Sequence, residues 1–259
     1  MVLPDEPFTL RGGCSCGAIR YRIDVPAKAN RPPNFTLGHN PDMSDPKTAR
    51  IPCVAACHCN DCRLAVGTVP SQVIICAANM VTVSALPRDP KVEETRAITG
   101  RLMKLLQPST SAEESDARRP PYLPALDVLR PNLPGSQDTW LRFFHTINCS
   151  SEMFSRAFCG RCGTMVCYHF AIKVLVDYVG DPVVMPDSWS DCIDIMLGTI
   201  DREQLDQPWM APERELNFND GISWAKAVAV KGLPGPKHPA GLFGQFVDED
   251  VVEAIAKQK

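Results

Sequence analysis

Three clusters of cysteine constrain this chain more than any other feature of its sequence. They are the pair Cys14/Cys16, the triplet Cys57/Cys59/Cys62 and the pair Cys159/Cys162. CxC and CxxC spacings in a chain without an apparent secretion signal indicate metal binding before disulfide bonds. A fold for this chain therefore has to bring together sulfurs that lie far apart in the sequence.

The two outer pairs together supply four sulfurs, which is the number that a closed tetrahedral zinc site requires. The last pair is flanked by Gly160 and Gly163, as in a zinc knuckle, where the chain turns tightly so that backbone N–H groups face the thiolates. Glycine tolerates the positive φ that such a turn demands. We therefore expect a structural zinc that ties the first strand to the middle of the chain, held by Cys14, Cys16, Cys159 and Cys162.

The central triplet supplies three sulfurs and no fourth ligand within its own motif. The thiolate is the form of cysteine that binds zinc, and a zinc site with three protein ligands keeps a position for chemistry. We therefore expect a second zinc on Cys57, Cys59 and Cys62, with one coordination position open for chemistry. An alternative stays open, because Cys53 lies four residues before Cys57. If Cys53 were the fourth ligand, the second zinc would be structural.

A simpler explanation treats all seven cysteines as small buried apolar residues. Three clusters whose ligands sum to one closed and one open site disfavour it. The other cysteines stand alone or at strand spacing, and we interpret most of them as core residues. They are Cys53, Cys76, Cys149, Cys167 and Cys192.

Polar residues within the triplet are candidates for catalysis. His58 lies between two ligands, so we expect its side chain to support the loop rather than to bind the metal. Arg63 would offset thiolate charge and hold a substrate carboxylate, although a plain surface arginine is an equal alternative. Asp61 and His58 are the candidates for general acid and base. Weaker candidates lie further along the chain: Ser150, Ser151, His145 and His169.

The pattern outside the clusters predicts a mainly β fold with long irregular insertions and a short C-terminal helix. The chain has 259 residues with 24 prolines, and residues 19–25 alternate between apolar and polar side chains as a half-buried strand does. Proline-rich insertions are expected at 26–52 and 84–138 within one zinc domain, 1–259. Residues 98–106, inside the second insertion, fit a strand or a short helix equally well. Further strands are expected at 72–76, 80–83, 139–146, 165–170, 193–200 and 225–231, and the final helix would be capped by Asp248.

Charge and hydropathy exclude two classes of partner. The formal net charge is −3 and no basic run exceeds Arg118-Arg119, which disfavours binding to nucleic acid. No apolar run approaches the roughly 20 residues of a membrane-spanning helix. The first residues, 1–11, carry Asp5 and Glu6 and no apolar signal core, which predicts a cytoplasmic protein. The expected partner is a small molecule, a thiol or a carbonyl compound.

The clusters, in this order, resemble the glutathione-dependent formaldehyde-activating enzyme family, which also includes centromere protein V and its relatives. The matching stretches are spread over nearly the whole chain and are jointly specific. They are Gly12-Gly13-Cys14-Ser15-Cys16-Gly17 with Ile19-Arg20-Tyr21, Cys57-His58-Cys59-Asn60-Asp61-Cys62-Arg63, Ser150-Ser151, Arg156-Ala157-Phe158-Cys159-Gly160-Arg161-Cys162-Gly163-Thr164, Gly198-Thr199-Ile200-Asp201, and Ser223-Trp224 with Gly232-Leu233-Pro234.

The resemblance implies an Mss4-like β fold with a structural zinc on the outer pairs and a catalytic zinc on the triplet. It also implies a carbon–sulfur lyase activity, the joining of glutathione, as co-substrate, to formaldehyde as S-hydroxymethylglutathione. The chain is longer than a compact member of such a family, and the excess lies in the two insertions, which favours a larger metabolite as the substrate in a specialised pathway. The centromere-associated relatives suggest an alternative of another class, a zinc-stabilised binding or scaffold module without catalysis.

Overall fold

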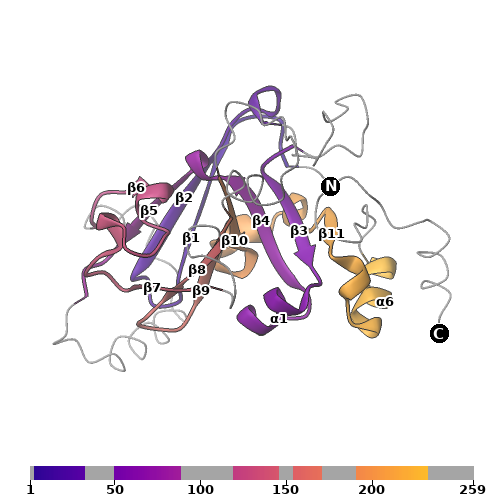
Figure 1. Cartoon of the computed structure of the whole chain (residues 1–259). Helices are drawn as coiled ribbons and strands as arrows, with labels where there is room; N and C mark the ends of the chain where they lie inside the picture. Colours follow the sequence, from indigo (N-terminus) through magenta and orange to yellow (C-terminus); the bar gives the residue numbers. More distant parts are fainter. Residues whose placement is uncertain (1–2, 33–49, 89–118, 146–153, 171–190, 233–259) are drawn as a thin grey trace, which may run out of the picture.

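The computed structural model describes residues 3–32, 50–88, 119–145, 154–170 and 191–232. These residues form eleven strands in two sheets with few helices, so the mainly β class is confirmed for them (Figure 1). No helix in these ranges has both the length and the apolar character needed to cross a membrane. The expected elements at 98–106 and after Asp248 lie outside the described residues, as do Cys149, Ser150 and Ser151.

The smaller sheet has four antiparallel strands in the order β1-β2-β5-β6. Strand β2 occupies the residues predicted for it, and its alternate side chains from Ile19 to Val25 are buried. Tyr21 of β2 also contacts a residue outside this sheet, because its hydroxyl lies 2.7 Å from the hydroxyl of Thr199. The strands are β1 (Phe8–Gly13), β2 (Ile19–Val25), β5 (Val81–Ala85) and β6 (Leu123–Pro124).

The larger sheet has seven strands in the order β11-β3-β4-β10-β9-β8-β7. Only the β11–β3 pair is parallel among these described strands, and the others are antiparallel. Apolar residues from both sheets form one continuous core, in which strand β3 is buried along its whole length. The strands are β3 (Cys53–Cys57), β4 (Ser71–Ala77), β7 (Leu141–Phe144), β8 (Phe154–Cys159), β9 (Met165–Phe170), β10 (Cys192–Met196) and β11 (Arg214–Leu216).

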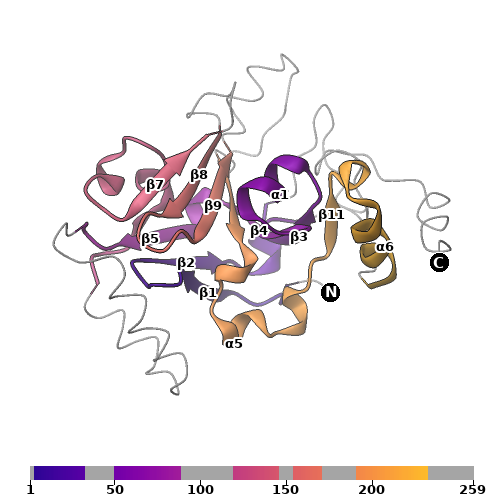
Figure 2. The ribbon, with the colours of Figure 1, turned by 90° about the horizontal axis from the view of Figure 1, so that it is seen from below.

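Helices lie at the edge of the larger sheet that carries the cysteine triplet. Helix α1 (Asn60–Val66) lies beside β3 and β4, and α6 (Ser223–Gly232) lies beside β11; Figures 1 and 2 agree on this arrangement. A third helix, α5 (Arg202–Leu205), follows β10. Short 3-10 helices complete the described elements: η1 (Lys28–Asn30), η2 (Ala78–Met80), η3 (Ala125–Asp127), η4 (Pro134–Ser136), η5 (Leu197–Thr199), η6 (Pro208–Met210) and η7 (Phe218–Asp220).

One predicted strand is wrong. Residues 225–231 belong to helix α6, in which Ala225 and Ala229 are buried one turn apart. The alternation of alanine and valine suggested a strand, but alanine is the strongest helix former and its spacing here suits one helix face. Two other strands are shorter than predicted. The strand expected at 193–200 is β10, which ends at Met196, and the strand expected at 139–146 is β7, which spans Leu141–Phe144.

The end of the second insertion is structured rather than irregular. Residues 119–138 contribute β6 and two 3-10 helices. The guanidinium of Arg119 donates hydrogen bonds to the carbonyl oxygens of Gly17, Ala18 and Ser84. This part of the insertion therefore braces the turn that carries the first cysteine pair.

Candidate metal centres

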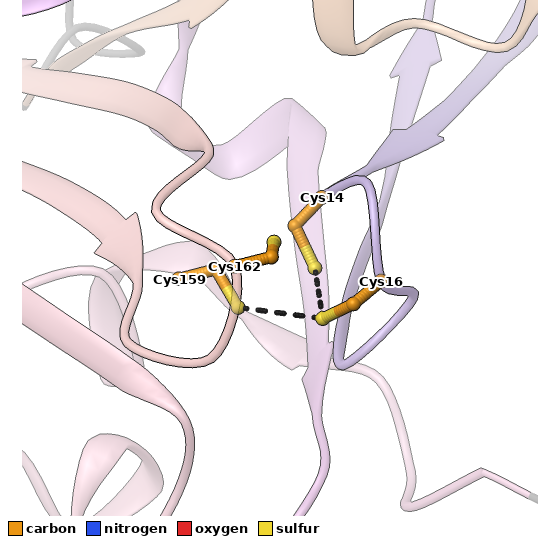
Figure 3. A group of neighbouring side chains, drawn as sticks. All are labelled: Cys14, Cys16, Cys159 and Cys162. Atoms are coloured by element: carbon orange, nitrogen blue, oxygen red, sulfur yellow. Dashed lines mark hydrogen bonds between the residues drawn. The ribbon is translucent and has the colours of Figure 1, made fainter. Parts of the chain in front are cut away.

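The four-cysteine site, which consists of Cys14, Cys16, Cys159 and Cys162, joins two β-turns. The first pair lies between β1 and β2. In the second pair, Cys159 ends β8 and Cys162 lies in the turn before β9, so the site links the smaller sheet to the larger one (Figure 3). All four sulfurs lie within 4.8 Å of one another. The Sγ atoms of Cys14 and Cys16 are 3.6 Å apart, and those of Cys16 and Cys159 are 3.7 Å apart.

These separations suit a tetrahedral zinc ion. Four sulfurs at the usual zinc–sulfur distance of about 2.3 Å define a tetrahedron with edges of about 3.8 Å. Backbone groups also face the sulfurs, since the N–H of Ile19 donates to Cys14 Sγ at 3.2 Å. The four side chains that the sequence predicted to converge therefore do converge, with donors arranged as for thiolates.

Glycine serves two purposes in these turns. Gly17 and Gly163 have φ of 76° and 73°, the left-handed region that glycine tolerates best. Gly160 does not share this conformation; a Cβ there would lie 2.8 Å from Cγ of Arg142. The expectation of positive φ is therefore confirmed for Gly163, whereas Gly160 is needed for close packing.

The three-cysteine site, which consists of Cys57, Cys59 and Cys62, lies where β3 meets α1. Cys57 ends the strand, Cys59 caps the helix, and the backbone N–H of Cys62 donates to Cys59 Sγ at 3.3 Å. The sulfurs of Cys57 and Cys59 are 3.5 Å apart, and all three lie within 4.8 Å of one another. Hydrogen bonds from the Cys57 and Cys62 thiols hold the pKa of Cys59 well below its usual range. The geometry suits three ligands of one metal ion.

Asn217 supports this site from the neighbouring strand. The parallel pairing of β11 with β3 sets Leu216 beside Cys57, so the next residue reaches the end of β3. The amide Nδ2 of Asn217 donates to Cys57 Sγ at 3.2 Å, and its backbone is left-handed, with φ of 50°. Hydrogen bonds of this kind hold a ligand sulfur in place and favour its charged form.

Cys53 is not a fourth ligand. It opens β3 while Cys57 ends it, and four steps of about 3.3 Å along a strand separate their backbones by about 13 Å. Among the described residues, no histidine, cysteine, aspartate or glutamate joins the three sulfurs within ligand distance. The alternative in which Cys53 closes the site is thereby excluded.

His58 contacts a carboxylate instead of the sulfurs. Its Nε2 lies 2.5 Å from Oε2 of Glu215 on β11, and both side chains are buried. The imidazole also packs edge-on against Phe218, with ring centroids 5.4 Å apart. This placement is the loop-supporting position expected for His58, and it joins the triplet loop to β11.

The basic residue that the structure brings to the three-cysteine site is Arg156 of β8. Its Nη2 is ion-paired with Asp61 and lies 3.8 Å from Cys62 Sγ. Burial alone would lower the pKa of Arg156, but the Cys62 sulfur and the Asp61 carboxylate raise it overall. Arg63, the cation predicted for this role, lies against the side-chain oxygen of Asn60 at 3.4 Å.

A row of polar side chains continues from Arg156 across the larger sheet. Strand register pairs Arg156 with Tyr168 and Tyr168 with Asp194, and residues directly opposite one another share one face. The Arg156 guanidinium lies 4.3 Å from the centroid of the Tyr168 ring. Burial raises the pKa of Asp194 to about 7. The side of the sheet next to the triplet thus carries a cation and an acid that titrates near neutral pH.

Sequence reasoning assigned no role to Arg156, Asp194 or Asn217. A signal existed for Asp194, because it is the one acid in an otherwise apolar strand, Cys-Ile-Asp-Ile-Met. Arg156 lies three residues before Cys159, but only strand order reveals that it reaches the other cluster. Asn217 is far from Cys57 in sequence and carries no local signal. His169 is buried on β9 near Asp191, and His145 follows β7, so neither is brought into the site.

No family model and no curated protein matches this chain.

Proposed function

We propose that the chain is a zinc-dependent enzyme of the carbon–sulfur lyase type, which joins a thiol to a carbonyl compound and catalyses the reverse cleavage. The observation that carries this proposal is the three-cysteine site, whose sulfurs converge without a fourth ligand among the described residues. A closed site of four ligands usually stabilises structure, whereas a site with three leaves a position for chemistry. The resemblance to the glutathione-dependent formaldehyde-activating enzymes and their Mss4-like fold supports the same proposal.

The donor set favours zinc as the metal at both sites. All seven ligands are cysteine sulfurs, and tetrahedral thiolate sites select zinc or iron–sulfur clusters rather than magnesium or calcium. The sulfur separations near 3.6 Å match a single ion of about 2.3 Å bond length. Zinc at the three-cysteine site would lower the pKa of a thiol or water and polarise a carbonyl group.

The chain's own residues prepare this site in three ways. Asn217 and the backbone of Cys62 donate hydrogen bonds to sulfurs, which favours their thiolate forms. Asp61 holds the Arg156 guanidinium against Cys62, where it would balance the negative charge that three thiolates leave beside a divalent ion. Asp194, with a pKa raised to about 7 by burial, can hold or release a proton at its carboxyl group near neutral pH.

The proposal is tested by mixing zinc-loaded protein with glutathione and formaldehyde. The rate at which they exchange with S-hydroxymethylglutathione is measured by NMR. The rate without protein is measured as the baseline, because the reaction also proceeds uncatalysed. We expect faster exchange with wild-type protein, loss of the acceleration and of one zinc in Cys59→Ala, and retention of both in Cys53→Ala. Cys53 is the matched control since it is a buried cysteine at the start of β3, the strand that ends at Cys57, and lies outside both cysteine sites.

Two results would count against the proposal. No acceleration by a protein that carries two zinc ions would remove formaldehyde and glutathione as substrates. If Cys59→Ala failed to fold while Cys53→Ala folded, the second metal would be structural, and the scaffold alternative would be favoured.

A further inference from the structure

The guanidinium of Arg156 has hydrogen-bonding capacity that its protein contacts do not use. Its side chain is 1% exposed, and Nη2 alone makes the contacts to Asp61 and Cys62. Nε and Nη1 have no hydrogen-bond partner among the described residues. A buried donor without an acceptor costs about 1–3 kcal/mol, so two such donors on one guanidinium call for a partner such as a water molecule or a ligand.

The unused donors lie beside the three-cysteine site. All five N–H groups of arginine belong to one planar fork, and one nitrogen of that fork is 3.8 Å from Cys62 Sγ. The plane itself is held over the Tyr168 ring and by the ion pair with Asp61. A group that bonds to Nε or Nη1 is therefore held close to the sulfurs in a fixed orientation.

The charge around Arg156 determines whether its unused N–H groups bind a carboxylate oxygen or a neutral carbonyl oxygen. Acidic groups already surround the Arg156 guanidinium, because Asp61 is ion-paired with it and Asp194 lies on the same face of the sheet two strands away. A substrate carboxylate would add a further negative charge, whereas a neutral carbonyl oxygen adds none. Arginine donors bind such an oxygen directly, and more strongly once it becomes charged.

We propose that the unused N–H groups of Arg156 bind the carbonyl oxygen of the electrophile, and that this position accepts a neutral carbonyl group in preference to a carboxylate. The inference rests on the proposed thiol–carbonyl reaction. In that reaction a sulfur–carbon bond forms, the carbonyl π bond breaks, its electron pair goes to oxygen, and the proton lost by the thiol ends on that oxygen. The negative charge moves from sulfur to oxygen without any net gain, and Arg156 donates where the charge arrives.

The direct test is a titration followed on the arginine side chains. Zinc-loaded protein labelled with ¹⁵N-arginine is titrated with acetamide, a neutral and unreactive carbonyl probe, and separately with acetate, its anionic isostere. Arg156 is assigned through its own backbone, so no variant is needed. We expect a saturable shift of the Arg156 guanidinium resonances with acetamide, a smaller effect of acetate, and neither effect at Arg63. Absence of a saturable acetamide shift, or tighter binding of acetate, would overturn the assignment.

Kinetics provide the second test. At saturating thiol, Arg156→Lys should lower kcat/KM for formaldehyde at least tenfold, as loss of an oxyanion donor does, while the KM for the thiol changes less than twofold. Arg202→Lys, at an arginine of α5 whose side chain is exposed, is the control and should change neither. A larger effect on the thiol than on formaldehyde would overturn the proposal.

Failure of the proposed function and failure of this inference give different results. A saturable acetamide shift in a protein without turnover would keep the oxygen site and remove the thiol–aldehyde reaction. Turnover without the shift would remove the role of Arg156 and leave the reaction in place.

Discussion

Replacing Asp61 with asparagine measures how strongly α1 is tied to the larger sheet through Arg156. The two ends of this ion pair differ in exposure, with the Arg156 side chain 1% exposed and that of Asp61 50% exposed. Breaking a fully buried pair costs about 3–5 kcal/mol, and exposed pairs contribute about 1 kcal/mol or less. Because only the cation is buried, we expect Asp61→Asn to lower the free energy of unfolding by about 2 kcal/mol. In a chain of this size that corresponds to a fall in Tm of about 4–8 °C.

The assay is a double-mutant cycle in zinc-saturated buffer, followed by urea denaturation. Arg156→Met removes the buried charge and keeps much of the side-chain volume, so the Asp61→Asn change should cost far less in that background. The exposed pair Arg202–Asp206, whose side chains are 85% and 72% exposed, provides the control. Asp206→Asn should change stability by less than about 0.5 kcal/mol. Additive effects of Asp61→Asn and Arg156→Met, within about 0.5 kcal/mol, would refute the reasoning.

Three further predictions concern other contacts of the two sites. Cys159→Ser should remove one zinc per chain. It should also weaken zinc binding at the three-cysteine site about 10–100-fold, because β8 carries both Cys159 and Arg156. Metal analysis with chelator competition measures both effects, and unchanged affinity at the three-cysteine site would contradict the prediction. Burial raises the pKa of Asp194 from 3.8 to about 7, so the unfolded chain ionises first as pH rises and the free energy of unfolding falls between about pH 4 and pH 7. Asp194→Asn should therefore remove about 1–2 kcal/mol of the loss between pH 5 and pH 8 in urea titrations, and an identical pH slope in both proteins would exclude this. Glu215→Ala leaves the buried His58 without its partner and should cost about 1–3 kcal/mol, whereas Glu215→Gln, which keeps a hydrogen-bonding group, should cost less in the same assay.

The two groups of cysteines that could hold metal ions were predictable from the sequence because their spacing is a local property. CxC and CxxC pairs force sulfurs onto one turn, and the count of sulfurs then separates a four-ligand site from a three-ligand one. Strand β2 was predictable for a similar reason, since alternation from Ile19 to Val25 is visible within seven residues. The assignment of Ala225–Lys231 failed because a short run of alanine and valine fits a strand and a helix equally well until its neighbours are known.

The residues that surround the ligands could not be predicted, because strand order determines them. Arg156 reaches Cys62 only because its side chain extends from β8 toward α1. Asn217 reaches Cys57 only through the parallel pairing of β11 with β3. Neither pairing has a sequence signature at that distance along the chain. The Arg63 role was inferred from adjacency in sequence, whereas the structure turns that side chain toward Asn60.

The four-cysteine site has a consequence for how the chain is made. Its ligands come from both ends of a long interval, with Cys16 and Cys162 separated by 146 positions. A ribosome that adds about 5–20 residues per second needs about 7–30 s to cross that interval. Through this time the first two thiols of a nascent chain have no partners for a closed site, and a cell that makes this protein has to keep them reduced until the second pair emerges. Oxidants present during synthesis would thus damage this protein more than oxidants that arrive after the metal is bound.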